Sequence, residues 1–218
     1  TGSGGSTYVW DNGLGAGATH TVTPAVTTTY QVTGTDMNGC TNTASVTVSI
    51  TTAPAVTATA ASPSICIGSS TTLTGGGALN YTWDNGLGAG PSFSVNPAAT
   101  TTYHVTGTSA TGCSASASVT VTVNSIPTIT ASATVPTICA GNSSTINAGG
   151  GATYNWSGLG TNASYSVNPS TTTTYTVTGT SAAGCSNTAN VTVNVNALPN
   201  VTASAVSPAI CIGNSTSV

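Results

Sequence analysis

The chain repeats one unit of about 73 residues, and this period limits the folds open to it more than any other feature. Trp10, Trp83 and Trp156 follow one another at intervals of 73 residues. Two series of cysteines recur at intervals of 73 and then 72 residues: Cys40, Cys113 and Cys185, and Cys66, Cys139 and Cys211. A fixed period of this size predicts a repeat architecture in which each unit is one structural module.

The period divides the chain into four segments. Residues 53–125 and 126–197 are two complete repeats, residues 1–52 are a partial repeat without its first strands, and residues 198–218 begin a further repeat. The final Ser217-Val218 aligns with Thr72-Leu73, and the initial Thr1-Gly2 aligns with Thr74-Gly75. We therefore expect the chain to be a section of a longer array that continues beyond both ends.

The composition excludes several classes of partner. The chain has no Lys or Arg and only three acidic residues, Asp11, Asp36 and Asp84. Without cations it cannot neutralise nucleic-acid phosphates or hold an anionic lipid surface. No stretch approaches the roughly 20 apolar residues of a membrane-spanning helix. We expect no nucleic-acid binding and no membrane insertion.

Alternating residues predict short strands throughout the complete repeat 53–125. Val119, Val121 and Val123 fall on one face of an expected strand and the intervening threonines on the other, the period of two residues typical of a half-buried strand. We expect Gly75–Gly77 to end one strand, and Ile65–Ser69 to form a turn. The expected strands cover residues 56–60, 71–74, 80–83, 92–95, 101–106 and 117–123.

These strands predict an all-β fold of tandem immunoglobulin-like antiparallel β-sandwich domains in a linear array. Trp83 lies on the expected third strand, where such domains bury a tryptophan, and Tyr103 opens the penultimate strand, as a tyrosine corner does. The same positions recur in the other repeats. The predicted core aromatics are Trp10, Trp83, Trp156, Tyr30, Tyr103 and Tyr175.

Three stretches carry a resemblance to a known class of repeat. They are residues 65–74, the Tyr81-x-Trp83 pair, and Thr101-Thr102-Tyr103-x-Val105 followed by Gly112-Cys113 and 118–121. They resemble the immunoglobulin-like repeats of very large secreted surface proteins of Bacteroidetes-type bacteria, including gliding-motility adhesins. The resemblance covers the whole chain and implies export to the cell exterior and a structural or adhesive role.

Six cysteines at corresponding positions, with no CxxC pair and no clustered His, favour disulfides formed in an oxidising compartment. Pairing across repeats, Cys66 with Cys185, is favoured because Cys66 and Cys113 are expected at opposite poles of one sandwich. A strand of ten residues spans about 33 Å, whereas bridged Cα atoms lie about 5.5–6 Å apart. Cys139 and Cys211 would then pair with Cys40 and Cys113 of the next segment. Pairing within a repeat, Cys66 with Cys113 and Cys139 with Cys185, stays open, as do Cys40–Cys66 and Cys113–Cys139.

No group of residues indicates catalysis, a cofactor or a metal site. His20 aligns with Phe93 and Tyr165, which indicates a packing role, and His104 aligns with Gln31 and Thr176. Asp84-Asn85-Gly86 is typical of a turn, and calcium would need more carboxylates than a repeat supplies. We expect no enzyme, because no pair of titratable groups recurs.

The sequence favours a structural segment of a long extracellular bacterial surface fibre or adhesin, serving as a stalk or in attachment, gliding or matrix formation. The partners open to it are neighbouring repeats, copies in a filament, and a surface or glycan ligand that the sequence does not identify. The alternative is an array of carbohydrate-binding modules attached to a secreted enzyme, in which Tyr81 and Trp83 would stack on sugars. That alternative requires at least one solvent-exposed tryptophan.

Overall fold

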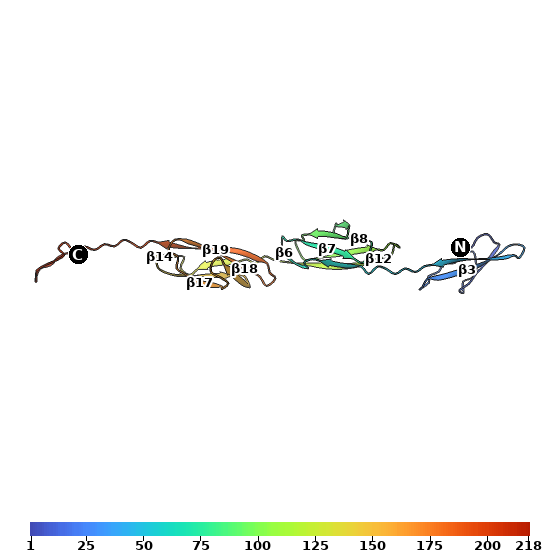
Figure 1. Ribbon diagram of the computed structural model, residues 1–218, viewed down its shortest axis with the longest axis horizontal. Coiled ribbons are helices and arrows are strands. Elements are labelled where there is room, and N and C mark those ends of the chain that lie inside the picture. The colour runs from blue at the N-terminus through green and yellow to red at the C-terminus, as the bar shows by residue number, and fades with distance from the viewer. The chain divides into compact units, whose positions relative to one another are not determined.

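The computed structural model describes residues 1–218 and consists of strands, turns and loops (Figure 1). The chain forms two compact units. The first contains Thr1–Ala61, Thr72–Phe93 and Thr102–Val119, and the second contains Ser62–Thr71, Ser94–Thr101 and Thr120–Val218. No helix has the length and apolar character needed to cross a bilayer.

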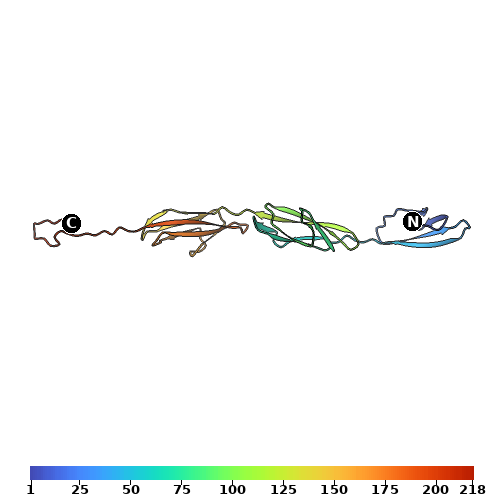
Figure 2. The ribbon, with the colours of Figure 1, turned by 90° about the horizontal axis from the view of Figure 1, so that it is seen from above.

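The repeat 126–197 is a sandwich of two sheets, which Figure 2 shows from above. One sheet has the order β13-β15-β17 and the other the order β14-β19-β18-β16. The bounds are β13 Thr130–Ala133, β14 Thr137–Cys139, β15 Ser144–Gly149, β16 Thr153–Trp156, β17 Ser164–Val167, β18 Thr173–Thr180 and β19 Ser186–Asn196. The first strand, β13, lies in one sheet, and the short second strand, β14, lies in the other. The chain then ends the repeat with the β18–β19 hairpin, which is the immunoglobulin-like arrangement.

One face of each sheet forms the core of this repeat. Alternate residues point inward, so Ile146 on β15 and Val177 and Val193 on the β18–β19 hairpin are fully buried around Trp156. The β-branched side chains at these positions pack well on a pleated sheet. Their threonine and asparagine neighbours face outward, which is why a chain almost without charge still has a polar surface.

The repeat 53–125 has the same strand order. Its sheets are β10-β7-β5 and β6-β12-β11-β8-β9, in which β9 extends the edge beside β8. Leu73, Val105 and Val121 are fully buried at the positions of Ile146, Val177 and Val193. The bounds are β5 Thr57–Ala60, β6 Ser64–Cys66, β7 Thr71–Gly76, β8 Asn80–Trp83, β9 Gly88–Ala89, β10 Ser92–Val95, β11 Thr101–Thr108 and β12 Ser114–Asn124. The prediction of an all-β, immunoglobulin-like sandwich is confirmed.

Two local expectations were wrong. Residues Ser64–Cys66 are a strand that pairs in parallel with the end of β12, with Cys66 opposite Asn124, although the sequence suggested a turn. The turn follows only at Gly68, whose φ is 84°. The strand β7 continues through Gly75 and ends at Gly76. At the next residue, Gly77, a Cβ atom would overlap the carbonyl oxygen of Ala55. The glycines before Gly77 pair normally with β5, because glycine removes no backbone hydrogen-bonding group.

Residues 1–52 form one sheet with the order β2-β1-β3-β4. The strands are β1 Thr7–Trp10, β2 Gly15–Ala16, β3 Thr28–Thr35 and β4 Thr41–Val48. Trp10, Tyr30 and Val32 form its small core. Residues 19–22 align with β10 and β17 but are not a strand, because the strand that β10 and β17 pair with has no counterpart in this segment.

Residues 198–218 contain no strand. Large apolar side chains of this segment, including Val201, Val206 and Ile212, are exposed.

Candidate functional site: the cysteine junctions

A disulfide joins Cys66 of one repeat to Cys185 of the next. The two Cα atoms are 5.6 Å apart, and 119 positions separate the two residues in the sequence. This is the pairing across repeats that the sequence favoured. Both cysteines belong to the second compact unit, so the bond fastens the end of the repeat 53–125 to the repeat 126–197.

Cys66 is positioned by the parallel pairing of β6 with β12. The amide of Ile67 donates to the carbonyl of Asn124 at 2.9 Å, and the amide of Ser69 donates to the carbonyl of Cys66 at 2.9 Å. Proline cannot donate, but Pro63 accepts a hydrogen bond from the amide of Thr122 at 2.8 Å. Cys66 is thereby held beside the residue at which the chain leaves its sandwich.

Cys185 is positioned by the tip of the β18–β19 hairpin. Ser181 and Cys185 close the tip, with the amide of Ser181 donating to the carbonyl of Cys185 at 2.8 Å. The amide of Cys185 donates to the hydroxyl of Ser181 at 3.2 Å. Gly184 supplies the positive φ of 84° that the tight turn requires. Cys185 is only 1% exposed.

The linker between the repeats lies between these two cysteines. The Sγ atom of Cys185 is 3.9 Å from the carbonyl oxygen of Asn124. The side-chain amide of Asn187 donates to the carbonyl of Pro127 at 3.2 Å. Ile129, just beyond the linker, packs on Gly179, where any side chain would overlap it. These contacts hold the linker on both sides of the disulfide.

Sequence reasoning missed the roles of Asn124, Pro127 and Asn187 in this junction. None of them has a pattern that marks a contact, because the linker is irregular. The alternation in Ser64-Ile65-Cys66, with Ile65 buried, could have indicated the short strand that carries Cys66.

Cys113 occupies the position of Cys185 in the preceding repeat, but it is a free thiol. Its hairpin closes in the same way, with the amide of Ser109 donating to the carbonyl of Cys113 at 2.9 Å. Its Sγ atom lies 3.0 Å from the hydroxyl of Thr51 and 3.8 Å from the carbonyl oxygen of Thr51. Thr51 aligns with Asn124, so the contact of Cys113 with Thr51 is the counterpart of the contact of Cys185 with Asn124.

The remaining three cysteines are also free and are exposed. Cys40 lies in the β3–β4 hairpin, where its amide donates to the Asp36 carboxylate at 2.8 Å. Cys139 ends β14 opposite Asn196, as Cys66 ends β6. Cys211 begins a turn in which the amide of Asn214 donates to its carbonyl at 3.0 Å.

The predicted core aromatics lie in the hydrophobic cores of the repeats and of the sheet of residues 1–52. Trp10, Trp83 and Trp156 are 7%, 3% and 1% exposed. Tyr30 and Tyr103 are buried, and Tyr175 is half-buried against the core of its repeat. The indole N–H groups of Trp10 and Trp83 donate to the carbonyls of Gly17 and Gly90.

The indole nitrogen of Trp156 is buried without a partner. The loop after Trp156 is one residue shorter than the loop after Trp83, and Asn162 stands where Gly90 stands. The shortened loop therefore presents no carbonyl to the indole.

The titratable residues have structural roles. His20 lies edge-on to Trp10, with 6.3 Å between ring centroids, in the aromatic position expected for it. The Asp84 carboxylate accepts a hydrogen bond from the amide of His104 at 2.9 Å, and Asn85 and Gly86 adopt the positive φ angles of a tight turn. Burial raises the pKa of Tyr103 above its usual value of 10.0, and the negative charge of Asp84 raises it further.

A scan against known protein families and a search of curated proteins find no match to the sequence. Among solved structures, the chain is similar to a 1.5-MDa bacterial ice-binding adhesin, with 19% identity, a TM-score of 0.36, and coverage of 78% of this chain and 74% of that chain. It is similar to a Ca2+-stabilized adhesin of an Antarctic bacterium, with 19% identity, a TM-score of 0.40, and coverage of 78% and 57%. It is also similar to fibronectin(III)-like modules of CbhA from Clostridium thermocellum, with 13% identity, a TM-score of 0.38, and coverage of 64% and 94%. At these identities and scores, the assignment of the fold rests on the strand order described above.

Proposed function

We propose that the chain is a structural segment of a long extracellular bacterial surface fibre or adhesin, in which immunoglobulin-like repeats are fastened to one another by disulfides. The observation that carries this proposal is the Cys66–Cys185 bond, which joins two repeats that each have a core of their own. A bond placed there keeps neighbouring repeats together when the chain is pulled.

The disulfide also supports an extracellular location. Structural disulfides form and persist in secreted and surface proteins, and thiols are kept reduced in the cytosol. The absence of Lys and Arg fits this setting, because trypsin-like proteases have no residue to cut after. The proposed role is mechanical and not enzymatic.

The carbohydrate-binding alternative lacks the feature that it needs. Its sugar-stacking surface would require an exposed tryptophan, and all three tryptophans are buried. Tyr81 is half-buried, and its hydroxyl is engaged with the backbone of Ala78 at 2.7 Å and 2.9 Å. Acrylamide should therefore quench the tryptophan fluorescence of the folded chain weakly, whereas strong quenching would revive the alternative.

Single-molecule stretching from the two chain ends tests the mechanical role. In the oxidised chain, the 119-residue span between Cys66 and Cys185 is locked and cannot extend. At about 3.3–3.6 Å per residue, the fully stretched oxidised chain should be shorter than the reduced chain by about 400 Å. Equal lengths before and after reduction would contradict the proposal that this bond carries the applied force. Immunogold labelling of intact producing cells should place the repeats on extracellular fibres, and labelling confined to the cytoplasm would refute the proposed location.

A further inference from the structure

The repeat 126–197 has no charged side chain. The acidic residues and histidines of the chain all lie within residues 1–125, and the chain has no Lys or Arg. An ion pair therefore cannot hold a ligand on this repeat. Any ligand that binds there must be recognised by hydrogen bonds and van der Waals contacts.

The loop after β16 departs from its counterpart in the repeat 53–125. There the loop closes on β8, because the amide of Gly90 donates to the carbonyl of Tyr81 at 3.1 Å. In the repeat 126–197, Asn162 stands in the place of Gly90, and its amide donates to the hydroxyl of Tyr165 at 3.2 Å. Tyr165 aligns with Phe93, which has no hydroxyl. The hydroxyl of Tyr165 thus draws the loop away from β16.

A hollow of about 720 Å³ lies between β16 and this loop. Its volume is in the range of small-molecule sites, about 300–1,000 Å³. Uncharged polar side chains from β16, the loop and β18 line it: Thr153, Asn155, Thr161, Asn162, Thr178 and Thr180. None of these side chains makes a hydrogen bond to another residue, so their donors and acceptors are free for a ligand.

Substitutions accompany the one-residue deletion in this loop. Thr161 and Asn162 replace Ala89 and Gly90 of the repeat 53–125. The loop that turns away from β16 therefore also carries a new hydroxyl and a new side-chain amide beside the hollow. These changes make the hollow a feature of the repeat 126–197 and not of the common fold.

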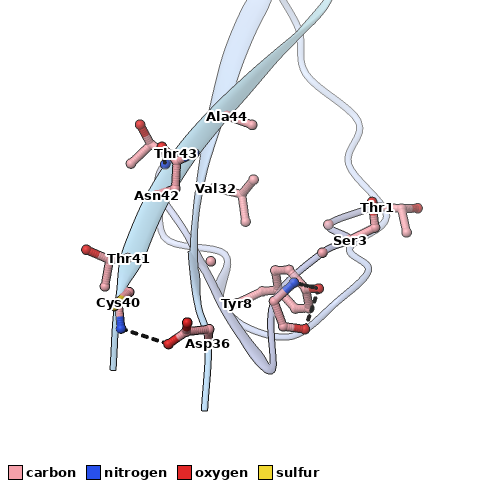
Figure 3. A pocket seen from close by; sticks show the side chains of 14 residues that line it. Thr1, Ser3, Tyr8, Val32, Asp36, Cys40, Thr41, Asn42, Thr43 and Ala44 are labelled. Carbon is pink, nitrogen blue, oxygen red and sulfur yellow. Dashed lines mark hydrogen bonds between the residues drawn. The ribbon is translucent and has the colours of Figure 1, made fainter. Parts of the chain in front are cut away.

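Tyr154 also lines the hollow and is fixed in place. Its hydroxyl donates to the carbonyl of Gly151 at 2.8 Å and accepts from the amide of Gly151 at 3.0 Å. The aligned Tyr8 makes the same two bonds to Gly5, both of 2.7 Å, in the sheet of residues 1–52 (Figure 3). Because the ring is anchored beforehand, it loses little conformational entropy when a ligand binds.

The open edge of β16 is too short for an added peptide strand. The amide of Trp156 donates to the carbonyl of Gly160 at 2.8 Å, and the amide of Gly160 donates back at 3.2 Å. Main-chain groups alternate between the two sides of a strand, and those of Thr153 and Asn155 face β18. This leaves Tyr154 as the residue of β16 whose main-chain groups face the hollow, whereas strand addition needs a row of such groups.

We propose that this hollow binds a neutral carbohydrate. Threonine hydroxyls and asparagine side-chain amides both donate and accept hydrogen bonds, and so do the hydroxyls of a sugar. The site differs from the stacking surface of a carbohydrate-binding module array, because it occurs in one repeat and exposes no tryptophan. It is also independent of the proposed mechanical role, because it does not use the Cys66–Cys185 bond.

The test titrates the ¹⁵N-labelled 218-residue chain with neutral tetrasaccharides of glucose, mannose, galactose and N-acetylglucosamine, followed by NMR. We expect at least one of them to shift the signals of β16 and of residues 161–163 with a dissociation constant of about 0.1–5 mM, since the site is open and has no ion pair. Because no charged group takes part, this constant should stay within about twofold between about 50 and 500 mM salt.

Three outcomes would overturn the proposal. One is the absence of a saturable shift with every tetrasaccharide, and another is a saturable shift confined to other parts of the chain. The third is a saturable shift only with a synthetic peptide that has the sequence of residues 86–91, because such a result would indicate strand addition at β16 instead.

A matched pair of variants tests the hollow itself. Asn155 and Asn190 are both exposed on the outer face of the same sheet, but Asn155 lines the hollow and Asn190 lies on β19, two strands from β16. We expect Asn155→Ala to weaken binding of the tetrasaccharide by about tenfold, because its side-chain hydrogen bonds are lost, and Asn190→Ala to leave it unchanged. Equal affinities of the two variants would refute the site.

A loop exchange gives a second, independent check. Replacing residues 157–163 with the sequence of residues 84–91 restores the longer loop that closes on the strand edge in the repeat 53–125. This variant should keep the circular dichroism spectrum of the chain and lose the tetrasaccharide shifts. Undiminished binding would contradict the assignment of the ligand to this hollow.

Discussion

Removing the Cys66–Cys185 bond should destabilise the repeat 126–197 by an amount that follows from loop length. When this repeat unfolds alone, Asn124 stays paired with Cys66, so the bond closes an unfolded loop from Asn124 to Cys185, a separation of 61 residues. The chain-entropy model gives about 4.3 kcal/mol at 25 °C for a loop of that size. If both repeats unfold together, the separation is 119 residues, and the model gives about 4.9 kcal/mol. The prediction therefore depends little on how cooperatively the repeats unfold.

The variant is Cys66→Ala/Cys185→Ala, studied by calorimetry and by chemical denaturation. For a module of about 73 residues, a loss near 4 kcal/mol lowers the midpoint temperature by on the order of 20 °C. Ala183→Ser, an exposed change in the hairpin that carries Cys185, is the control and should leave the midpoint within a few degrees. A loss below about 1 kcal/mol in the double variant would refute the loop-closure reasoning.

Three further predictions follow from the sandwich cores. Val193→Ala should lower the free energy of unfolding by about 2–3 kcal/mol in denaturant titrations, because it empties a fully buried site. The exposed Val201→Ala is the control and should change it by under about 0.5 kcal/mol, and equal losses would contradict the burial of Val193. Gly150→Ala should lower the free energy of unfolding by roughly 2–5 kcal/mol, because a Cβ atom there overlaps the Thr128 carbonyl. A Cβ atom on Gly184 meets no other atom, so Gly184→Ala should lower it only by the roughly 1–2 kcal/mol that a positive φ costs. Because the pKa of Tyr103 is raised in the folded state, its contribution to stability is complete below pH 10.0 and is lost as the pH rises through the raised pKa. Tyrosinate absorbance during an alkaline titration should show one late-ionising tyrosine that Asp84→Asn shifts to lower pH, and no change in this variant would exclude the Asp84 contribution.

The sandwich could be predicted from the sequence because periodicity and burial agree along its strands. Val119, Val121 and Val123 alternate with polar residues, and the structure turns all three inward. The cross-repeat bond could be favoured because strand length separates the two poles of a sandwich by far more than a disulfide spans.

Other features depend on tertiary context that local patterns do not carry. Ser64–Cys66 is a strand only because the end of β12 lies beside it, and a stretch of three residues has too short a pattern to show this. Gly75 and Gly76 remain in a strand because β5 pairs with them, although glycine is unfavourable in a strand interior. The unpaired indole of Trp156 follows from the one-residue deletion in the loop after it, and no local pattern marks that consequence.

The most direct test of the account is a disulfide map of the unreduced protein. Pepsin needs no Lys or Arg, and it acts at acid pH, where thiol exchange is slow because few thiols are ionised. Mass spectrometry of the digest should find Cys66 linked to Cys185, which are 5.6 Å apart between Cα atoms in the structure. A linked peptide that joins Cys66 to Cys113 would instead place the bond inside one repeat and contradict the fastening of neighbouring repeats.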